Sequence, residues 1–267
     1  LELGAMRACA ENGFSLMTQT ANPSKPKDQQ AIVQQAETGR FDGLILTPPF
    51  SDRIELINAI IATNTPVVGI SAGPDTQALV PWVGINDYEA GQAIGHFLAE
   101  RGHKCFAYID GPIDHRSAGM RLQGFIKALS HHGMGAHSVR VLQGNFTVKS
   151  GVELAEILLS SGDRPTALVC ANDDMAAGAL LSAHKMNLAI PEDISITGFD
   201  DTPVSRIVWP PLTTVHQPIR QFGARAVELL IDNIQSSQKI FGEIPTVSGG
   251  YIPFEVVERL STRGMQT

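Results

Sequence analysis

Short apolar runs alternate with amphipathic segments along nearly the whole chain, and this alternation constrains the fold more than any other feature. Near-continuous apolar runs are typical of strands buried on both faces of a sheet. Alternation of strands and helices predicts an α/β fold with parallel sheets and right-handed crossovers. Strands are predicted at 14–19, 42–47, 66–71, 82–85, 105–110, 167–171, 194–199 and 212–215, and helices at 27–38, 52–63, 87–101, 117–131, 148–160, 173–186 and 219–235.

Capping residues mark several of these helices. Ser51 and Asp87 are expected at helix starts, where a side-chain oxygen accepts from a free amide. Residues 1–12 form an amphipathic pattern that ends at Gly13, and they lack the basic start and apolar block of a signal peptide. The chain is therefore expected to begin inside a fold. Other helices are expected to end at Gly39, Gly102 and Gly133.

Composition excludes several classes of protein. The chain of 267 residues is 43% hydrophobic and 18% charged, which is typical of a globular protein with one large core or two smaller ones. Its formal net charge is −7 and no Lys/Arg cluster occurs, so this chain is not expected to bind DNA alone. No apolar run is long enough to span a bilayer. Three widely spaced cysteines favour reduced thiols in a cytoplasmic protein.

Polar residues follow two of the predicted strands. Asp200 and Asp201 follow 194–199 and are open to three interpretations: an acid/base pair, metal ligands, or acceptors for the hydroxyls of a sugar. Asn172 follows 167–171, and Asp173 is expected to cap the next helix. Because ligands of parallel sheets bind at the carboxyl ends of strands, Asp200 and Asn172 are candidate ligand contacts.

A catalytic interpretation depends on Gly69-Ile70-Ser71-Ala72-Gly73, which matches the G-x-S-x-G nucleophile elbow and is followed by Asp200 and His216 in the order of a hydrolase triad. The elbow requires a helix directly after the serine, whereas 74–77 reads as a turn, so a hydrolase is disfavoured. No G-x-G-x-x-G, P-loop or H-E-x-x-H motif occurs, and no cofactor is expected. His131-His132 has no acid or cysteine at ligand spacing, so no metal site is predicted.

One segment, Ile190–Pro218, contains the runs Ile194-Ser195-Ile196-Thr197-Gly198-Phe199-Asp200-Asp201 and Pro210-Pro211-Leu212-Thr213-Thr214. This segment closely resembles the signature of the LacI/GalR (lactose-repressor) family. Residues 117–125 resemble the family pattern S-x-x-x-R-x-x-G-[FWY]. The resemblance extends over nearly the whole chain. It implies a two-lobed fold like that of periplasmic binding proteins, each lobe a doubly wound parallel sheet, with three crossover segments. The first lobe would comprise 1–85 and 218–244, without the family's first strand, and the second 86–217 and 245–267.

The resemblance also implies roles for individual residues. Asp200 would accept hydrogen bonds from effector hydroxyls, Asn172 would contact the effector, and Arg121 would donate to its oxygens. Phe146 would line the pocket with an aromatic face. Weaker contacts are expected from Ser117, Gln217 and Ser71; at Ser71 this chain departs from the charged residue found nearby in many members.

By this resemblance the chain is expected to be the effector-binding and dimerisation core of a transcriptional regulator. A small-molecule effector, of carbohydrate type, would bind between the lobes and control operator binding by a helix-turn-helix that precedes residue 1. The protein would be a cytoplasmic homodimer and not an enzyme, with apolar residues of helices 1–12 and 219–235 at the interface. The alternative is a periplasmic sugar-binding protein of a transporter, which shares the fold; the three cysteines and the segment 210–215 favour the regulator.

Overall fold

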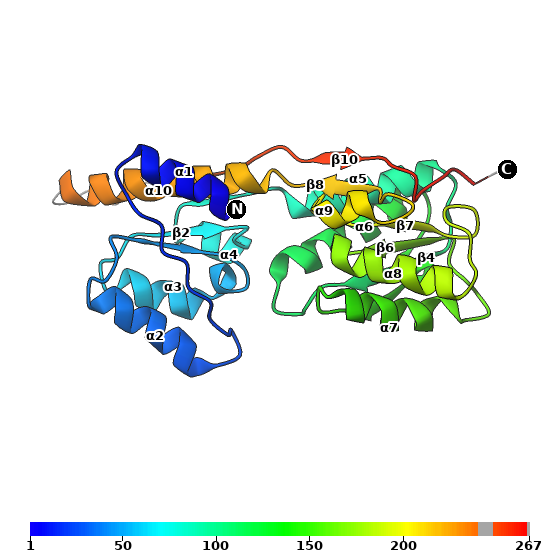
Figure 1. The fold of residues 1–267 in the computed structure, drawn as a ribbon, viewed down its shortest axis with the longest axis horizontal. Coiled ribbons are helices and arrows are strands. Elements are labelled where there is room, and N and C mark those ends of the chain that lie inside the picture. The colour runs from blue at the N-terminus through cyan, green and yellow to red at the C-terminus, as the bar shows by residue number, and fades with distance from the viewer. Residues whose placement is uncertain (240–247, 266–267) are drawn as a thin grey trace. The chain divides into compact units, whose positions relative to one another are not determined.

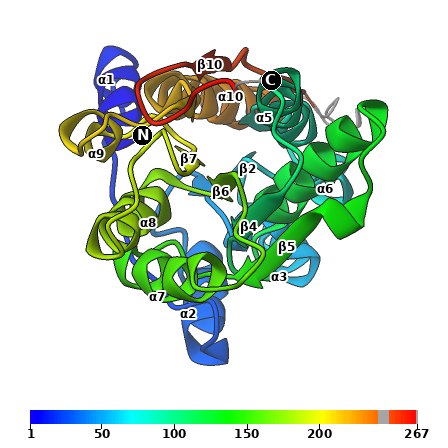
Figure 2. The ribbon, with the colours of Figure 1, turned by 90° about the vertical axis from the view of Figure 1, so that its right-hand side faces the viewer.

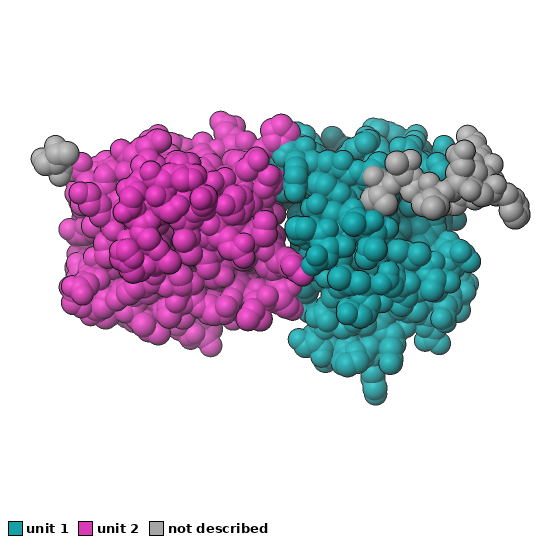
Figure 3. All heavy atoms as spheres, turned by 180° about the vertical axis from the view of Figure 1, so that it is seen from behind, with its two compact units in different colours: residues 1–85, 218–252 teal, residues 86–217, 253–267 magenta. Residues whose placement is uncertain are grey.

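The chain divides into two compact units in a computed structural model that describes residues 1–239 and 248–265. One unit comprises Leu1–Ile85 and Pro218–Ile252, and the other comprises Asn86–Gln217 and Pro253–Thr267 (Figures 1 and 3). The chain therefore passes from one unit to the other three times. We call them unit 1 and unit 2. The predicted α/β class with parallel sheets is confirmed.

Unit 1 is built on a four-stranded parallel sheet in the order β1-β2-β3-β9. Within this unit, α1 and α10 pack together on one face of the sheet and α2 and α3 lie on the other (Figure 1). Buried side chains of α3, β1 and β2 form one core cluster, and α1 with α10 forms a second. The elements are β1 (Leu44–Leu46), β2 (Val67–Ile70), β3 (Trp82–Gly84), β9 (Gly249–Tyr251), α1 (Glu2–Glu11), α2 (Pro26–Glu37), α3 (Ile54–Ile61), α4 (Pro74–Gln77), α10 (Ile219–Lys239) and a 3₁₀ turn (Phe50–Asp52).

The strand predicted at 14–19 is wrong, because this segment pairs with no strand of the described chain. A cavity of about 650 Å³ in unit 1 is lined by Phe14, Leu16 and Met17 on one side and by residues 42–47 on the other. The apolar pattern of the segment correctly indicates side chains facing a core. The pattern does not show whether another strand lies alongside to form the backbone hydrogen bonds that a β-strand requires.

Two further expectations for unit 1 need correction. Ser51 does not cap α3: it is buried within the 3₁₀ turn, and α3 begins at Ile54 after Arg53 without a side-chain cap. Residues 249–251 were assigned to the second lobe, but β9 pairs with β3 and belongs to unit 1. The lobe boundary predicted between 244 and 245 falls outside the described residues, and the passage between units comes after Ile252.

Unit 2 is built on a second parallel sheet, in the order β5-β4-β6-β7. The short strand β8 lies beside β7 through isolated bridges and pairs antiparallel with β10. The strand β5 was missed from the sequence because it is an edge strand whose residues alternate between more and less buried positions, so its V-R-V-L-Q is not a continuous apolar run. The strands are β4 (Phe106–Asp110), β5 (Val139–Gln143), β6 (Ala167–Cys170), β7 (Ser195–Thr197), β8 (Thr214–His216) and β10 (Glu255–Val257).

Helices cover both faces of this sheet, with α5 and α6 on one side and α7 and α8 on the other (Figure 2). Glycines allow close approach within the pairs: a Cβ on Gly91 would lie 2.0 Å from the carbonyl oxygen of Arg121, and one on Gly124 would lie 1.9 Å from that of Tyr88. The helix axes of α5 and α6 are therefore fixed by backbone contact. The helices are α5 (Asp87–Glu100), α6 (Arg116–His131), α7 (Val148–Leu159), α8 (Asp173–Lys185), α9 (Pro203–Ile207) and a 3₁₀ turn (Ala136–Ser138).

Several other predictions are confirmed. Gly13, Gly39, Gly102 and Gly133 follow helices with positive φ, as left-handed helix ends require. The three cysteines are free, at positions 9, 105 and 170. In the part of the chain that the structure describes, none of the helices combines the length and apolar character needed to cross a bilayer.

Candidate functional site

The carboxyl ends of four strands in unit 2 bring three polar side chains and one aromatic ring to one edge of the sheet. Because β4, β5, β6 and β7 are parallel, the residues that follow them lie at this edge. Asp110 ends β4, Phe146 lies beyond β5, Asn172 beyond β6 and Asp200 beyond β7. Three of these were predicted as ligand contacts, and the sheet places them at the same edge.

Arg121 is the buried cation of this edge. It extends from α6, is 6% exposed, and its Nε donates to Asp87 Oδ1 at 2.7 Å while Nη1 donates to the carbonyl oxygen of Ala171 at 3.0 Å. Its guanidinium lies 3.7 Å from the ring centre of Phe199. Burial alone would lower the pKa of Arg121, but Asp87 and Asp200 outweigh it and raise the pKa. The guanidinium is thus held in one position by contacts at the start of α5, after the end of β6 and after the end of β7.

Asp87 was predicted as a helix cap, and this is wrong. The cap of α5 is Asn86, whose side chain accepts from the amide of Glu89, whereas Asp87 turns inward to Arg121. Burial raises the pKa of Asp87, and the charge of Arg121 opposes the increase. The pair joins residues 34 positions apart, a distance at which sequence spacing gives no signal.

Asp200 lies beside this pair with φ of 107°, after the end of β7. Its amide donates to the carbonyl oxygen of Val215, and its Oδ1 accepts from Gln217 Nε2 at 2.6 Å. Burial raises the pKa of Asp200 to about 6, while Arg121 and the Gln217 hydrogen bond lower it. We refer to Asp87, Arg121, Asn172, Asp200 and Gln217 as the Arg121 cluster.

Asp201 faces a different set of partners from those of Asp200. Its carboxylate, 4% exposed, accepts from Arg206, Arg259 and Ser205 and bonds His216 Nδ1. Burial raises the pKa of Asp201, but the hydrogen bonds from Arg206, Arg259 and Ser205 outweigh it and hold the pKa below its ordinary value. The carboxylate binds the C-terminal segment to α9 and β8.

The predicted cap of α8 is wrong, because Asn172 and not Asp173 caps this helix. Asn172 is the N-cap: its Oδ1 accepts from the amide of Met175 at 3.0 Å, and its Nδ2 donates to the carbonyl oxygen of Phe146 at 3.1 Å. Asp173 is fully buried and accepts from Thr214 and Thr202. Burial raises its pKa to about 7 against those hydrogen bonds.

Phe146 lies half-buried beyond β5 with φ of 63°. Its ring packs against Gly111, where a Cβ would come within 2.3 Å of the ring, and meets His115 edge to face at 5.1 Å. Ser117 is 9% exposed in the first turn of α6, one turn before Arg121. The structure therefore places an aromatic ring and a hydroxyl on the elements that border the Arg121 cluster.

Ser71 belongs to unit 1. It follows β2 with φ of 49°, and its amide donates to the carbonyl oxygen of Val83. Residues 74–77 form the short helix α4 and not a turn, but the helix begins three residues after the serine. His216 bonds Asp201 and not Asp200, so the His216–Asp200 pair expected of a hydrolase is not formed.

Sequence reasoning missed two acids at the edge of the unit 2 sheet. Asp110 was seen only as the end of a strand, yet burial raises its pKa, against a hydrogen bond from the Gly111 amide and the charge of Arg121. Asp87 was assigned to capping. In both cases the missing signal was the position of Arg121, which only the packing of α6 against α5 provides.

Comparison with known proteins identifies relatives of this chain. Residues 96–262 match the periplasmic binding protein-like domain family. The HTH-type transcriptional repressor PurR of Erwinia tasmaniensis is 34% identical over 237 residues, which cover 87% of this chain and 68% of the repressor. The chain belongs to the LacI/GalR family. It corresponds to the effector-binding core of such regulators.

Solved structures give the same fold. A CelR transcriptional regulator in complex with cellobiose superimposes with a TM-score of 0.88 at 27% identity, covering 97% of this chain and 77% of that one. A dimeric Lac repressor superimposes with a TM-score of 0.84 at 24% identity, covering 99% and 93%. The family resemblance found from the sequence is therefore confirmed.

Proposed function

We propose that the Arg121 cluster binds a neutral, hydroxyl-rich effector of carbohydrate type and that this binding controls operator recognition. The observation that carries the proposal is the charge balance around Arg121. Three carboxylates, Asp87, Asp110 and Asp200, interact with this one cation. An anionic ligand would meet net negative charge at this edge, whereas hydroxyl groups can donate to the carboxylates and accept from the guanidinium.

The other predicted contacts suit the same ligand. The amides of Asn172 and Gln217 can each make four hydrogen bonds, and their side-chain bonds in the protein use only part of that capacity. The Phe146 ring offers an apolar face of the kind that packs on a sugar ring. CelR, 27% identical, was solved with cellobiose, which supports a carbohydrate. Ser117 and, from unit 1, Ser71 are proposed as weaker contacts.

A ligand screen tests this proposal. We expect a neutral mono- or disaccharide to raise the melting temperature, because a ligand that binds only the folded state stabilises it. Sugar acids, sugar phosphates and nucleobases serve as the comparison set. The Asp200→Asn variant should lose the response, and the exposed Asp163→Asn variant should keep it. Stabilisation by anionic ligands alone would contradict the charge argument.

We further propose that the protein acts as a cytoplasmic homodimer that contacts operator DNA through a helix-turn-helix outside this chain. The curated relatives are transcriptional repressors, and oligomers are most often symmetric pairs. On α1, Leu3 and Met6 are 42% and 56% exposed although α1 packs on α10. Light scattering should show a dimer that the double variant Leu3→Glu/Met6→Glu dissociates, while Ile113→Glu, at a 91% exposed position of unit 2, leaves it intact.

No catalytic activity is proposed. The relatives are repressors, and the helix that a nucleophile elbow requires directly after the serine begins only at Pro74. A fluorophosphonate probe should leave Ser71 unlabelled. Labelling that disappears in the Ser71→Ala variant would establish a nucleophile and contradict this part of the proposal.

A further inference from the structure

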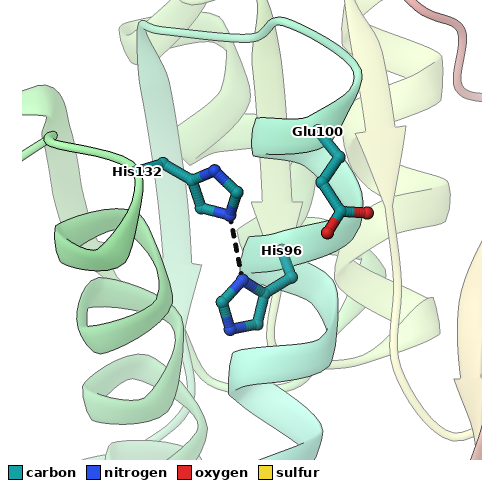
Figure 4. Close-up of side chains that lie close together, drawn as sticks. All are labelled: His96, Glu100 and His132. Carbon is teal, nitrogen blue, oxygen red and sulfur yellow. Dashed lines mark hydrogen bonds between the residues drawn. The ribbon is translucent and has the colours of Figure 1, made fainter.

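Two histidines and a glutamate, whose side chains are of the kinds that bind metal ions, lie close together on helices α5 and α6 of unit 2, away from the carboxyl ends of the strands. His96 and Glu100 are one turn apart on α5, and His132 is the C-cap residue of α6 (Figure 4). One ligand atom from each of the three residues lies within 4.8 Å of the others. His96 Nδ1 and His132 Nε2 are 2.9 Å apart and share a hydrogen bond. His96 is half-buried, and Glu100 and His132 are exposed.

The packing of the two helices fixes this geometry. Gly91 and Gly124 bring the backbones of α5 and α6 into direct contact, and a Cβ on Gly95 would lie 2.6 Å from the side chain of Ala128. His96 lies one residue beyond Gly95, so its distance from the C-terminus of α6 is set by backbone contact. A site whose ligands are already positioned loses less conformational entropy when it binds an ion.

We propose that His96, Glu100 and His132 form a binding site for Zn²⁺ or a similar divalent transition metal ion. Two imidazoles and one carboxylate are a common zinc ligand set, and water can occupy the fourth position of a tetrahedral ion. Ligand nitrogens around tetrahedral zinc lie about 3.3 Å apart. The two imidazole nitrogens need to separate by only a few tenths of an ångström for the ion to replace the shared proton.

The sequence did not predict this site, because His131-His132 has no acid nearby in the chain. The fold supplies the acid from α5, 32 positions before His132. The ring of His131 stacks on that of His96 at 5.7 Å, which restricts the orientation of the His96 imidazole. An ion here would link the two helices whose other parts carry Asp87 and Arg121, and would stabilise that helix pair.

Calorimetry on the metal-free, tag-free chain at pH 7.5 tests the proposal, because histidine must be deprotonated to bind a metal. We expect one Zn²⁺ per chain and an increase in melting temperature. His96→Ala and His132→Ala should each weaken binding about 100-fold, since loss of even an outer-shell partner costs about 10- to 100-fold. Glu100→Gln should weaken it about tenfold. His137→Ala, at an exposed histidine outside the group, is the matched control.

The absorption spectrum of the Co²⁺-loaded wild-type protein gives a second measurement that needs no variant. Tetrahedral Co²⁺ with nitrogen and oxygen ligands should show visible d–d bands without the intense near-ultraviolet band of a thiolate ligand. A thiolate band, or Zn²⁺ affinity unchanged in both histidine variants, would overturn the assignment. Absence of stoichiometric Zn²⁺ binding to the wild-type protein would also overturn it.

Discussion

Asp200 and Asp201 are neighbours in the chain, yet they belong to two differently built regions of unit 2. The Asp200 carboxylate accepts a hydrogen bond from the neutral amide of Gln217 and shares the cation Arg121 with other acids. Asp201 accepts from two arginines and a serine and also bonds His216. Burial raises the pKa of Asp200 to about 6, whereas the pKa of Asp201 is held below its ordinary value.

The difference shows which of two adjacent carboxylates is available to a ligand. Asp201 has its charge matched within the protein, and its partners include Arg259 of the C-terminal segment, so its role is to hold that segment. Asp200 is a half-buried acid that shares the cation Arg121 with other acids, and acids in such an environment gather at functional sites.

Replacing Asp201 should destabilise the protein most. In the Asp201→Ala variant Arg259, 15% exposed, loses its carboxylate partner. Removal of one member of a buried ion pair costs about 3–5 kcal/mol, and the lower value applies here because Arg206 and His216 are more exposed. Urea unfolding measures the loss, with Asp163→Ala as the exposed control. A variant as stable as the wild type would remove the distinction between the two acids.

Replacing Asp200 should affect ligand binding and not stability. Asp200→Asn keeps the shape but loses the charged acceptor, and hydrogen bonds to charged groups contribute about 1.5–3 kcal/mol. We expect effector affinity to decrease about 10- to 150-fold in calorimetry. The unfolding free energy at pH 7.5 should stay equal or increase, because a buried carboxylate is removed. An unchanged affinity would exclude Asp200 from the site.

The two acids should also give pH dependences of opposite sign. The pKa of folded Asp200 lies above its ordinary value, so its contribution to stability is present at low pH and is lost as pH rises through about 6. The pKa of folded Asp201 is lowered, so its contribution is present at neutral pH and is lost as pH falls below its ordinary value of 3.8.

Urea unfolding of Asp200→Asn, Asp201→Asn and wild type from about pH 2.5 to about pH 8 separates these contributions. The stability of Asp200→Asn relative to wild type should increase with pH, and that of Asp201→Asn should decrease. Effector affinity of the wild type should decline below about pH 6 as Asp200 takes up its proton. Parallel pH profiles for the two variants would contradict the assigned environments.

Asn172 should show the smallest effect, because it caps α8 besides lying at the same edge of the sheet as Asp200. Loss of an N-cap side chain costs about 1 kcal/mol. Thr147 caps α7 in the same way, accepting from the amide of Ser150, and is not a predicted ligand contact. We therefore expect Asn172→Ala and Thr147→Ala to lose similar stability, with effector affinity reduced only in Asn172→Ala. Equal affinities would restrict Asn172 to capping.

Local patterns in the sequence were sufficient to predict most helices and strands. Strands buried on both faces, such as β2, β4 and β6, read as apolar runs, and helix ends at Gly39, Gly102 and Gly133 follow from backbone geometry. Strand prediction failed for a strand that is buried on one face only and for an apolar segment that has no neighbouring strand to pair with. The edge strand β5 was not found, and residues 14–19 have the right composition but no adjacent strand in the described chain.

The sequence by itself determined the fold class and the placement of Asn172 and Asp200 after buried strands, because these depend on short-range periodicity, and its motifs indicated the family. Only the tertiary structure decided which charges meet. Arg121 pairs with Asp87 across 34 positions, Asp201 with Arg259 across 58, and His96 with His132 across 36. Such contacts arise from the packing of whole helices and strands, so residue types along the chain indicate that a charge needs a partner but not which partner it has.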